Sequence, residues 1–243
     1  MSQPPNLDNV LRVRRHHPTR LEGFFDASSA FAVTLVVISI GHAPHSVPEM
    51  LQAMRGLPAF ALSFLIISWI WKAHRNWSRH FDIEDDTAIF LSLALVFIVL
   101  VYAYPLRMMF ALMFEWNSRG FLADEPVELH SVEDLRWAFV VYGLGMCAIA
   151  AVFALLYRHA LQHAAAIGLD ACEALATRMH VALWALLAGV AALSVCTALV
   201  LPFSSERPWL FCIPGLIYLL MNVLAPRIRR NHKARIAALA TTT

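Results

Sequence analysis

Charged residues are scarce in this sequence. Asp, Glu, Lys and Arg together make up 15% of its 243 residues, whereas 59% are hydrophobic and the mean hydropathy is +0.60. An ordinary soluble domain carries about 25% charged residues. The scarcity therefore excludes an ordinary soluble domain, and the composition indicates an integral membrane protein.

The groupings that usually carry chemistry are also missing. The four cysteines show no CxxC spacing, so neither a disulfide framework nor a cysteine zinc site is indicated. The sequence contains no glycine-rich phosphate loop and no nucleophile followed by a recognisable base. We therefore expect that the protein is not an enzyme and that it holds no cofactor.

What the sequence does contain is long apolar runs, near the length of about 20 residues that a helix needs to cross a bilayer. They fall at 21–41, 57–79, 86–114, 136–160, 179–203 and 207–226. We expect an all-α polytopic membrane protein with six transmembrane helices. Pro105 should bend the third helix or end its regular part, and Pro214-Gly215 should kink the sixth.

The basic residues divide unevenly between the connecting segments. With a cytoplasmic N-terminus, 14 of the 19 Lys and Arg residues fall on the inner side, which favours six crossings with both termini inside. We divide the chain into a basic cytoplasmic segment (1–19), a six-helix transmembrane channel domain (20–228) and a basic cytoplasmic tail (229–243). We expect the tail to lie against anionic lipid and not to bind nucleic acid.

The first apolar run opens with two ionisable residues, Arg20 and Asp26. Six helical positions correspond to about 240° of rotation, so these two side chains cannot pair with each other. Arg20 could instead stack on Trp71 or Trp77. The end of the second run lies level with this start and offers donors to Asp26: Lys72, His74 and Arg75. The same residues also fit a snorkelling interface belt with aromatic side chains.

One face of the first helix is apolar and partly aromatic. Because positions three, four and seven apart share a face, it gathers the following residues: Phe24, Ala27, Ser28, Phe31, Thr34, Leu35 and Ile38. In a membrane such a face meets lipid, a neighbouring helix or a pore. The spacing leaves these alternatives open.

Two stretches resemble a known family, the transmembrane protein 175 potassium channels. The stretch RLEGFFD (20–26) resembles the family's RxxxFSD signature, and AFAVTLVVISI (30–40) resembles its apolar continuation. Trp71 and His74 resemble the tryptophan that is followed three residues later by histidine in the family's second helix. The resemblance is strong over about residues 20–110, and beyond them only the six-helix layout agrees.

The resemblance implies a homotetrameric channel for potassium or another monovalent cation, placed in the bilayer of a bacterial inner membrane. The first helix of every subunit would line a central pore without the TVGYG filter, which this sequence lacks as well. The implied constriction is at Phe31, with Thr34, Leu35 and Ile38 one or two turns onward. A network that locks the first helix against the second and against neighbouring subunits is implied for these residues: Arg20, Phe24, Asp26, Trp71 and His74.

The sequence departs from the family pattern at two positions. Phe25 replaces the motif serine, and Phe31 stands where the family usually has isoleucine or leucine. Four converging phenylalanines would close a pore more tightly and raise its dewetting barrier. Two other functions therefore stay open, a secondary or proton-coupled transporter and a non-conducting sensor or scaffold. The nearly charge-free middles of the six runs argue against the transporter.

A pair of histidines, His159 and His163, ends the fourth run at a spacing compatible with a metal ion. Asp170 or Glu173 could supply a further ligand. The pair fits solvated interface histidines as well, and we favour that interpretation and expect no bound metal. Asp85 or Asp86 is expected to cap the third helix.

Overall fold

The computed structural model describes residues 10–39, 44–123, 127–202 and 208–240, and all secondary-structure elements in these residues are helices. The longer helices are α1 (Arg20–Ile38), α3 (Leu57–Phe81), α4 (Asp86–Ser118), α5 (Val132–Gln162), α6 (Ala171–Val200) and α8 (Leu220–Ala240). Among the described residues, six stretches are long and apolar enough to cross a membrane. The predicted all-α fold with six spans is confirmed.

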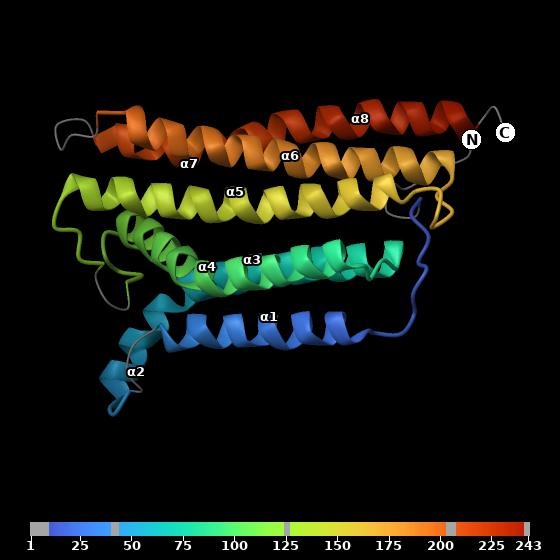
Figure 1. Ribbon diagram of the computed structural model, residues 1–243. Coiled ribbons are helices and arrows are strands. Elements are labelled where there is room, and N and C mark those ends of the chain that lie inside the picture. Colours follow the sequence, from blue (N-terminus) through green and yellow to red (C-terminus); the bar gives the residue numbers. More distant parts are fainter. Residues whose placement is uncertain (1–9, 40–43, 124–126, 203–207, 241–243) are drawn as a thin grey trace, which may run out of the picture.

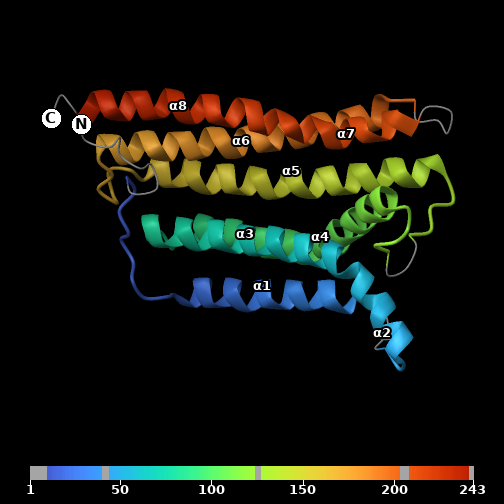
Figure 2. The ribbon, with the colours of Figure 1, turned by 180° about the vertical axis from the view of Figure 1, so that it is seen from behind.

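The long helices run side by side in layers. In both Figure 1 and Figure 2, α1 lies at one edge of the bundle and α8 at the opposite edge. α1 packs on α3 and α4, α4 packs on α5, α5 on α6, and α6 on α8. The first described residues and the end of α8 lie at the same end of the bundle, which we call the terminal end. Only one side of α1 is therefore covered by its own chain.

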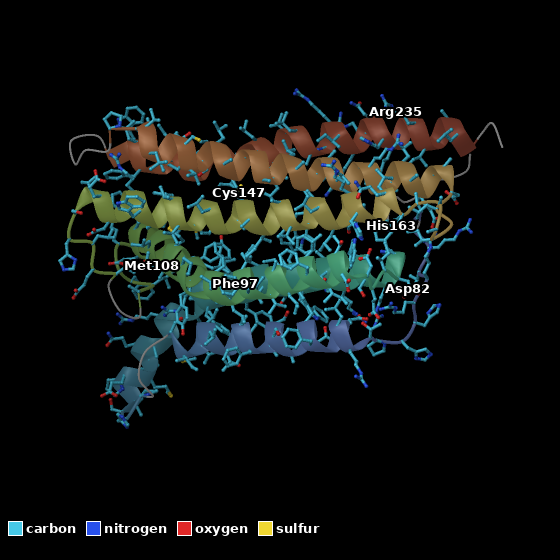
Figure 3. All side chains as sticks on the ribbon, in the orientation of Figure 1. Asp82, Phe97, Met108, Cys147, His163 and Arg235 are labelled. Carbon is cyan, nitrogen blue, oxygen red and sulfur yellow. The ribbon has the colours of Figure 1, made fainter. Side chains whose placement is uncertain are left out.

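Proline shapes two of the spans. α4 continues through Pro105, and Figure 3 shows its ribbon turning aside near Met108. Proline removes a backbone donor and crowds the preceding turn, which bends a helix that does not end. Around Pro214 the sixth span is divided into η3 (Pro208–Cys212), α7 (Ile213–Leu216) and η4 (Ile217–Leu219) before α8 begins. The expected bend is present at Pro105, and the sixth span is irregular around Pro214-Gly215, where a kink was predicted.

Several helix boundaries differ from those predicted by hydropathy. α6 begins at Ala171, eight residues before the predicted run, because a capping box between Asp170 and Glu173 starts the helix ahead of its apolar part. α3 is preceded by α2 (Val47–Ala53) and η2 (Met54–Gly56). α8 continues to Ala240, so most of the predicted tail is helical. Residues 203–207, where the fifth predicted run ends and the sixth begins, lie outside the described residues.

The close packing of α5 against its neighbours depends on two glycines. A Cβ on Gly145 would lie 2.2 Å from the ring of Tyr102 on α4, and one on Gly143 would lie 2.5 Å from a methyl group of Val195 on α6. Small residues let helix backbones approach closely in membranes. These contacts hold α4, α5 and α6 as a block against which α1 and α3 pack.

Candidate functional site

The uncovered side of α1 carries the side chains that were predicted to face a pore. Phe24, Phe31 and Ile38 are 52%, 55% and 61% exposed, Ala27 and Thr34 are exposed with them, and Leu35 is half-buried at the margin. The opposite side buries Phe25, Ala32 and Val36 against the bundle. We call the exposed set the outer stripe, defined by the following residues: Phe24, Ala27, Phe31, Thr34 and Ile38.

Hydroxyl groups on this side of α1 donate back to their own helix. The Ser28 hydroxyl donates to the carbonyl oxygen of Phe24 at 2.8 Å, and the Thr34 hydroxyl donates to that of Ala30 at 3.1 Å. Serine and threonine in helices commonly make this bond. Their protons are thereby occupied, and what the two hydroxyls still offer is oxygen lone pairs, which accept a proton or a cation.

Asp26 is bound by Trp71 of α3. The indole Nε1–H of Trp71 donates to Asp26 Oδ1 at 2.6 Å, and the guanidinium of Arg75 lies 5.4 Å from the centre of the Trp71 ring. The prediction of Lys72, His74 or Arg75 as the donor is wrong, whereas Trp71 was implied as a partner by the family resemblance. Arg75 also takes the place over the Trp71 ring that was predicted for Arg20.

His74 connects three helices through Phe25. The two rings are stacked with their centres 3.8 Å apart and an angle of 8° between their planes, and both residues are almost fully buried. His74 Nε2 shares a hydrogen bond of 3.0 Å with the hydroxyl of Ser92 on α4. The phenylalanine that replaces the family's serine therefore forms an aromatic contact where a hydroxyl was expected.

The two remaining residues of the predicted network lie on the exposed side of α1. Within the described residues, Arg20 forms no hydrogen bond or ion pair, and Phe24 belongs to the outer stripe. Neither contacts Trp71 or His74 in the way that Asp26 and Phe25 do. A role for Arg20 and Phe24 in contacts between subunits stays a prediction.

A buried carboxylate, Glu22, adds an anchor that the sequence analysis missed. Glu22 is 2% exposed, and its Oε1 accepts from Arg79 Nε at 3.1 Å and lies 3.9 Å from Arg75 Nε. Its Oε2 has no hydrogen-bond partner among the described residues. The sequence pattern that could have revealed this anchor is a carboxylate in the first turn of α1 together with two arginines four positions apart at the end of α3. Such a pair presents both cations on one helix face.

The basic segment before α1 is anchored to the bundle. The Arg14 guanidinium donates to Glu173 at 2.8 Å and 3.1 Å, and Glu173 is fully buried. The backbone N–H groups of Arg14 and Arg15 donate to the carbonyl of Arg79 at 2.9 Å and 3.1 Å. These bonds join the start of α6 to the end of α3. Residues 10–19 are therefore part of the folded structure and not a free basic arm.

Arg15 extends this attachment to the loop between α3 and α4. Its guanidinium contacts Asp82 and donates to Glu84 at 2.9 Å. A hydrogen bond from the Thr19 side chain, helped by Arg15, lowers the pKa of Glu84 against the opposing effect of burial. Both carboxylates and Arg15 thus fix the chain that leads into α1.

The two histidines at the end of α5 meet Asp85. Asp85 Oδ1 accepts from the backbone N–H of Ala88, which confirms the predicted cap of α4. Asp85 Oδ2 accepts from His159 Nε2 at 2.7 Å and lies 3.8 Å from His163 Nε2. Asp170 and Glu173, which we had considered as possible further ligands, do not join the histidines, because Asp170 pairs with Arg12 and Glu173 with Arg14.

Known proteins that are similar to this chain are potassium channels. A family model described as the endosomal/lysosomal potassium channel TMEM175 matches residues 20–103, which run from α1 into α4. A potassium channel from Marivirga tractuosa is 30% identical over 212 residues, which cover 85% of this chain and 84% of that protein.

A solved structure matches nearly the whole chain. The crystal structure of a variant of the potassium channel MtTMEM175 in complex with a Nanobody-MBP fusion protein has a TM-score of 0.79 and 27% identity, and the match covers 90% of this chain and 95% of that one. These channel relatives confirm that the protein is not an enzyme. The chain belongs to the TMEM175 family of potassium channels.

Proposed function

We propose that this protein conducts potassium through a central pore lined by the outer stripes of four α1 helices. The observation that carries the proposal is the position of α1 at the edge of the bundle, with its outer stripe uncovered (Figures 1 and 2). An apolar stripe of this kind meets either lipid or further copies of the chain. The relatives that match along most of the chain are potassium channels, which favours further copies around an ion path.

The contacts on the covered side of α1 support this proposal because they fix the rotation of the helix. Glu22, Phe25 and Asp26 bind or stack on α3, and together they hold two successive turns. A shift of one residue rotates a helix by about 100° and would move Phe31 off the axis. If the outer stripe met only lipid, the rotation of α1 would not need to be fixed in this way. In the proposed assembly, the anchors aim Phe31 at the pore.

The proposed constriction is hydrophobic. Phe31 lies midway along α1, and Ile38 lies two turns further along the same stripe. Rings of apolar side chains gate a pore by excluding water. Between them, the hydroxyl oxygen of Thr34 keeps lone pairs that accept a cation. Leu35 completes the predicted lining at the margin of the stripe.

The placement in the membrane follows from the basic residues. We propose that the terminal end faces the cytoplasm of a bacterial cell and that residues 1–19 and 229–243 lie on that side of the 20–228 channel domain. Arg235 lies toward this end, as does Asp82, which directly follows α3 (Figure 3). Arg79 is in the last turn of α3 and is bound by the backbone of Arg14. Cytoplasmic segments carry the excess of Lys and Arg. The basic face of α8 would rest against anionic lipid.

Reconstitution into liposomes with a potassium gradient tests the function. We expect flux that dissipates the gradient without a counter-ion and that does not saturate at high potassium concentration. A pH-sensitive or voltage-sensitive dye reports the flux, and liposomes without protein are the control. Flux that depends on a coupled ion would indicate a transporter. Absence of flux in wild type and in pore variants alike would indicate a sensor or scaffold and contradict the proposal.

The assembly can be tested at Asp26. Asp26→Ala removes the acceptor of the Trp71 indole, and hydrogen bonds to charged groups contribute about 1.5–3 kcal/mol. We expect a smaller fraction of tetramer in size-exclusion chromatography with light scattering. Ser29→Ala, one turn further along α1, is the matched control and should keep the wild-type fraction. Equal tetramer fractions in the two variants would remove the locking role of Asp26.

A further inference from the structure

Three potential metal ligands converge between the start of α4 and the end of α5. They belong to Asp85, His159 and His163, each of which places one ligand atom within 4.8 Å of the other two, and the Nε2 atoms of both histidines face Asp85 Oδ2. Asp85 is separated from the histidines by more than 70 positions, so only the fold brings them together. Figure 3 places His163 toward the terminal end of α5, one layer away from α3 and two from α1. The cluster is therefore separate from the outer stripe.

The hydrogen bonds around the cluster leave lone pairs available on two of its ligand atoms, His163 Nε2 and Asp85 Oδ2. His163 Nδ1–H donates to the carbonyl of His159 at 3.1 Å, so the lone pair of the neutral ring is on Nε2, which is the atom that faces Asp85. Metal-bound histidines almost always donate their other ring N–H in this way. The two carboxylate oxygens of Asp85 have different partners: Oδ1 caps α4, and Oδ2 faces the histidines. Asp85 Oδ2 and the Nε2 atoms of His159 and His163 therefore face one another.

The spacing fits a small transition-metal ion. Zn²⁺ binds histidine nitrogen and carboxylate oxygen at about 2.0–2.2 Å, which places tetrahedral ligands about 3.3 Å apart. Asp85 Oδ2 lies 2.7 Å from His159 Nε2 and 3.8 Å from His163 Nε2, so half an ångström of movement at each contact gives that separation. The 2.7 Å contact between His159 Nε2 and Asp85 Oδ2 is a hydrogen bond, and the metal ion would take the place of its proton. The side chains of Asp85 and His163 are 39% and 43% exposed, which leaves room for water as a fourth ligand.

The chemistry of the three ligands indicates which class of metal ion would bind. Two imidazoles and one carboxylate suit Zn²⁺, Co²⁺ or Ni²⁺, whereas Mg²⁺ and Ca²⁺ prefer ligands that are all oxygen. From the geometry, we propose that Asp85, His159 and His163 form a Zn²⁺-class site that joins α4 to α5.

Co²⁺ binding to the purified full-length protein tests this proposal. Tetrahedral Co²⁺ with nitrogen and oxygen ligands absorbs strongly in the visible, so titration with CoCl₂ should give intense bands that saturate at one ion per chain. ZnCl₂ should abolish these bands by displacement, and MgCl₂ should not. Asp85→Asn keeps the oxygen that caps α4 but loses the anionic ligand, and His163→Gln loses a half-exposed ligand. Each should weaken binding by roughly 100-fold, the upper end of what loss of a supporting group costs.

The control removes a rival chelating pair at the same end of the molecule. His16 and His17 are adjacent and exposed, and a double His16→Ala/His17→Ala variant should keep the cobalt bands. A second measurement is the unfolding temperature, which ZnCl₂ should raise in wild type and in this control but not in His163→Gln. Loss of the bands in the control, equal affinity in Asp85→Asn and wild type, or no visible bands in wild type would each overturn the site. These readouts do not depend on ion flux.

Discussion

Replacing Phe31 with alanine is expected to increase the initial potassium flux about tenfold or more. In the proposed tetramer this change removes four rings from the narrowest part of the pore, so water and ions cross a wider and less apolar constriction. A tenfold increase in flux requires the free-energy barrier to ion passage to fall by only about 1.4 kcal/mol. Flux into liposomes at equal protein density measures the effect. Phe31→Ile, which restores the usual residue of the family, should give an intermediate flux.

The matched control for this prediction is Phe97→Ala. Phe97 is 68% exposed on α4 and lies near the middle of the bundle, so it undergoes the same change of side chain away from the outer stripe (Figure 3). We expect wild-type flux. Wild-type flux in Phe31→Ala, or an equal increase in both variants, would show that Phe31 does not form the constriction. The fold and the family membership would be unaffected.

Replacing Arg79 with methionine is expected to destabilise the protein by about 3–5 kcal/mol, because it leaves the carboxylate of Glu22 buried without its hydrogen-bonding partner. Arg75 lies 3.9 Å away and compensates in part, which favours the lower end of that range. Thermal unfolding in detergent, followed by the loss of the folded peak in size-exclusion chromatography, measures the change. The start of α1 should loosen first.

A double-mutant cycle distinguishes the ion pair from the packing of the arginine stem. Glu22→Leu with Arg79→Met removes both charges, so the double variant should be more stable than Arg79→Met alone. Arg230→Met is the control, because Arg230 is exposed on α8. Additive effects of the two substitutions would mean that Glu22 and Arg79 are not coupled. Equal destabilisation by Arg230→Met would indicate a general effect of lost charge.

Residues close together in the sequence carried the correct predictions. Six spans follow from hydropathy alone, since a backbone that crosses lipid must satisfy its own hydrogen bonds as a helix. Pro105 and Pro214 marked their irregularities because proline removes a donor wherever it stands. Asp85 was recognisable as a cap from its local pattern. The family signature also lies within about two turns of α1 and one turn of α3.

The predictions that failed concern partners far apart in the chain. Helical spacing gave the angle between Asp26 and Arg20, but it gave no choice between Trp71 and the cations beside it on α3. One further failure is local. The start of α6 was placed too late because the helix begins at a capping box of Asp170 and Glu173, two charged residues that hydropathy assigns to a loop.

The sequence by itself determined that the chain crosses a membrane six times, where its helices bend, and which face of α1 is apolar. These properties depend on hydropathy and on local backbone geometry, which each residue carries with it. The tertiary structure decided that this face is left uncovered, that Glu22 meets Arg79, and that Asp85 meets His159. Such contacts depend on the order and rotation of helices packed side by side, which the period of a single helix does not specify.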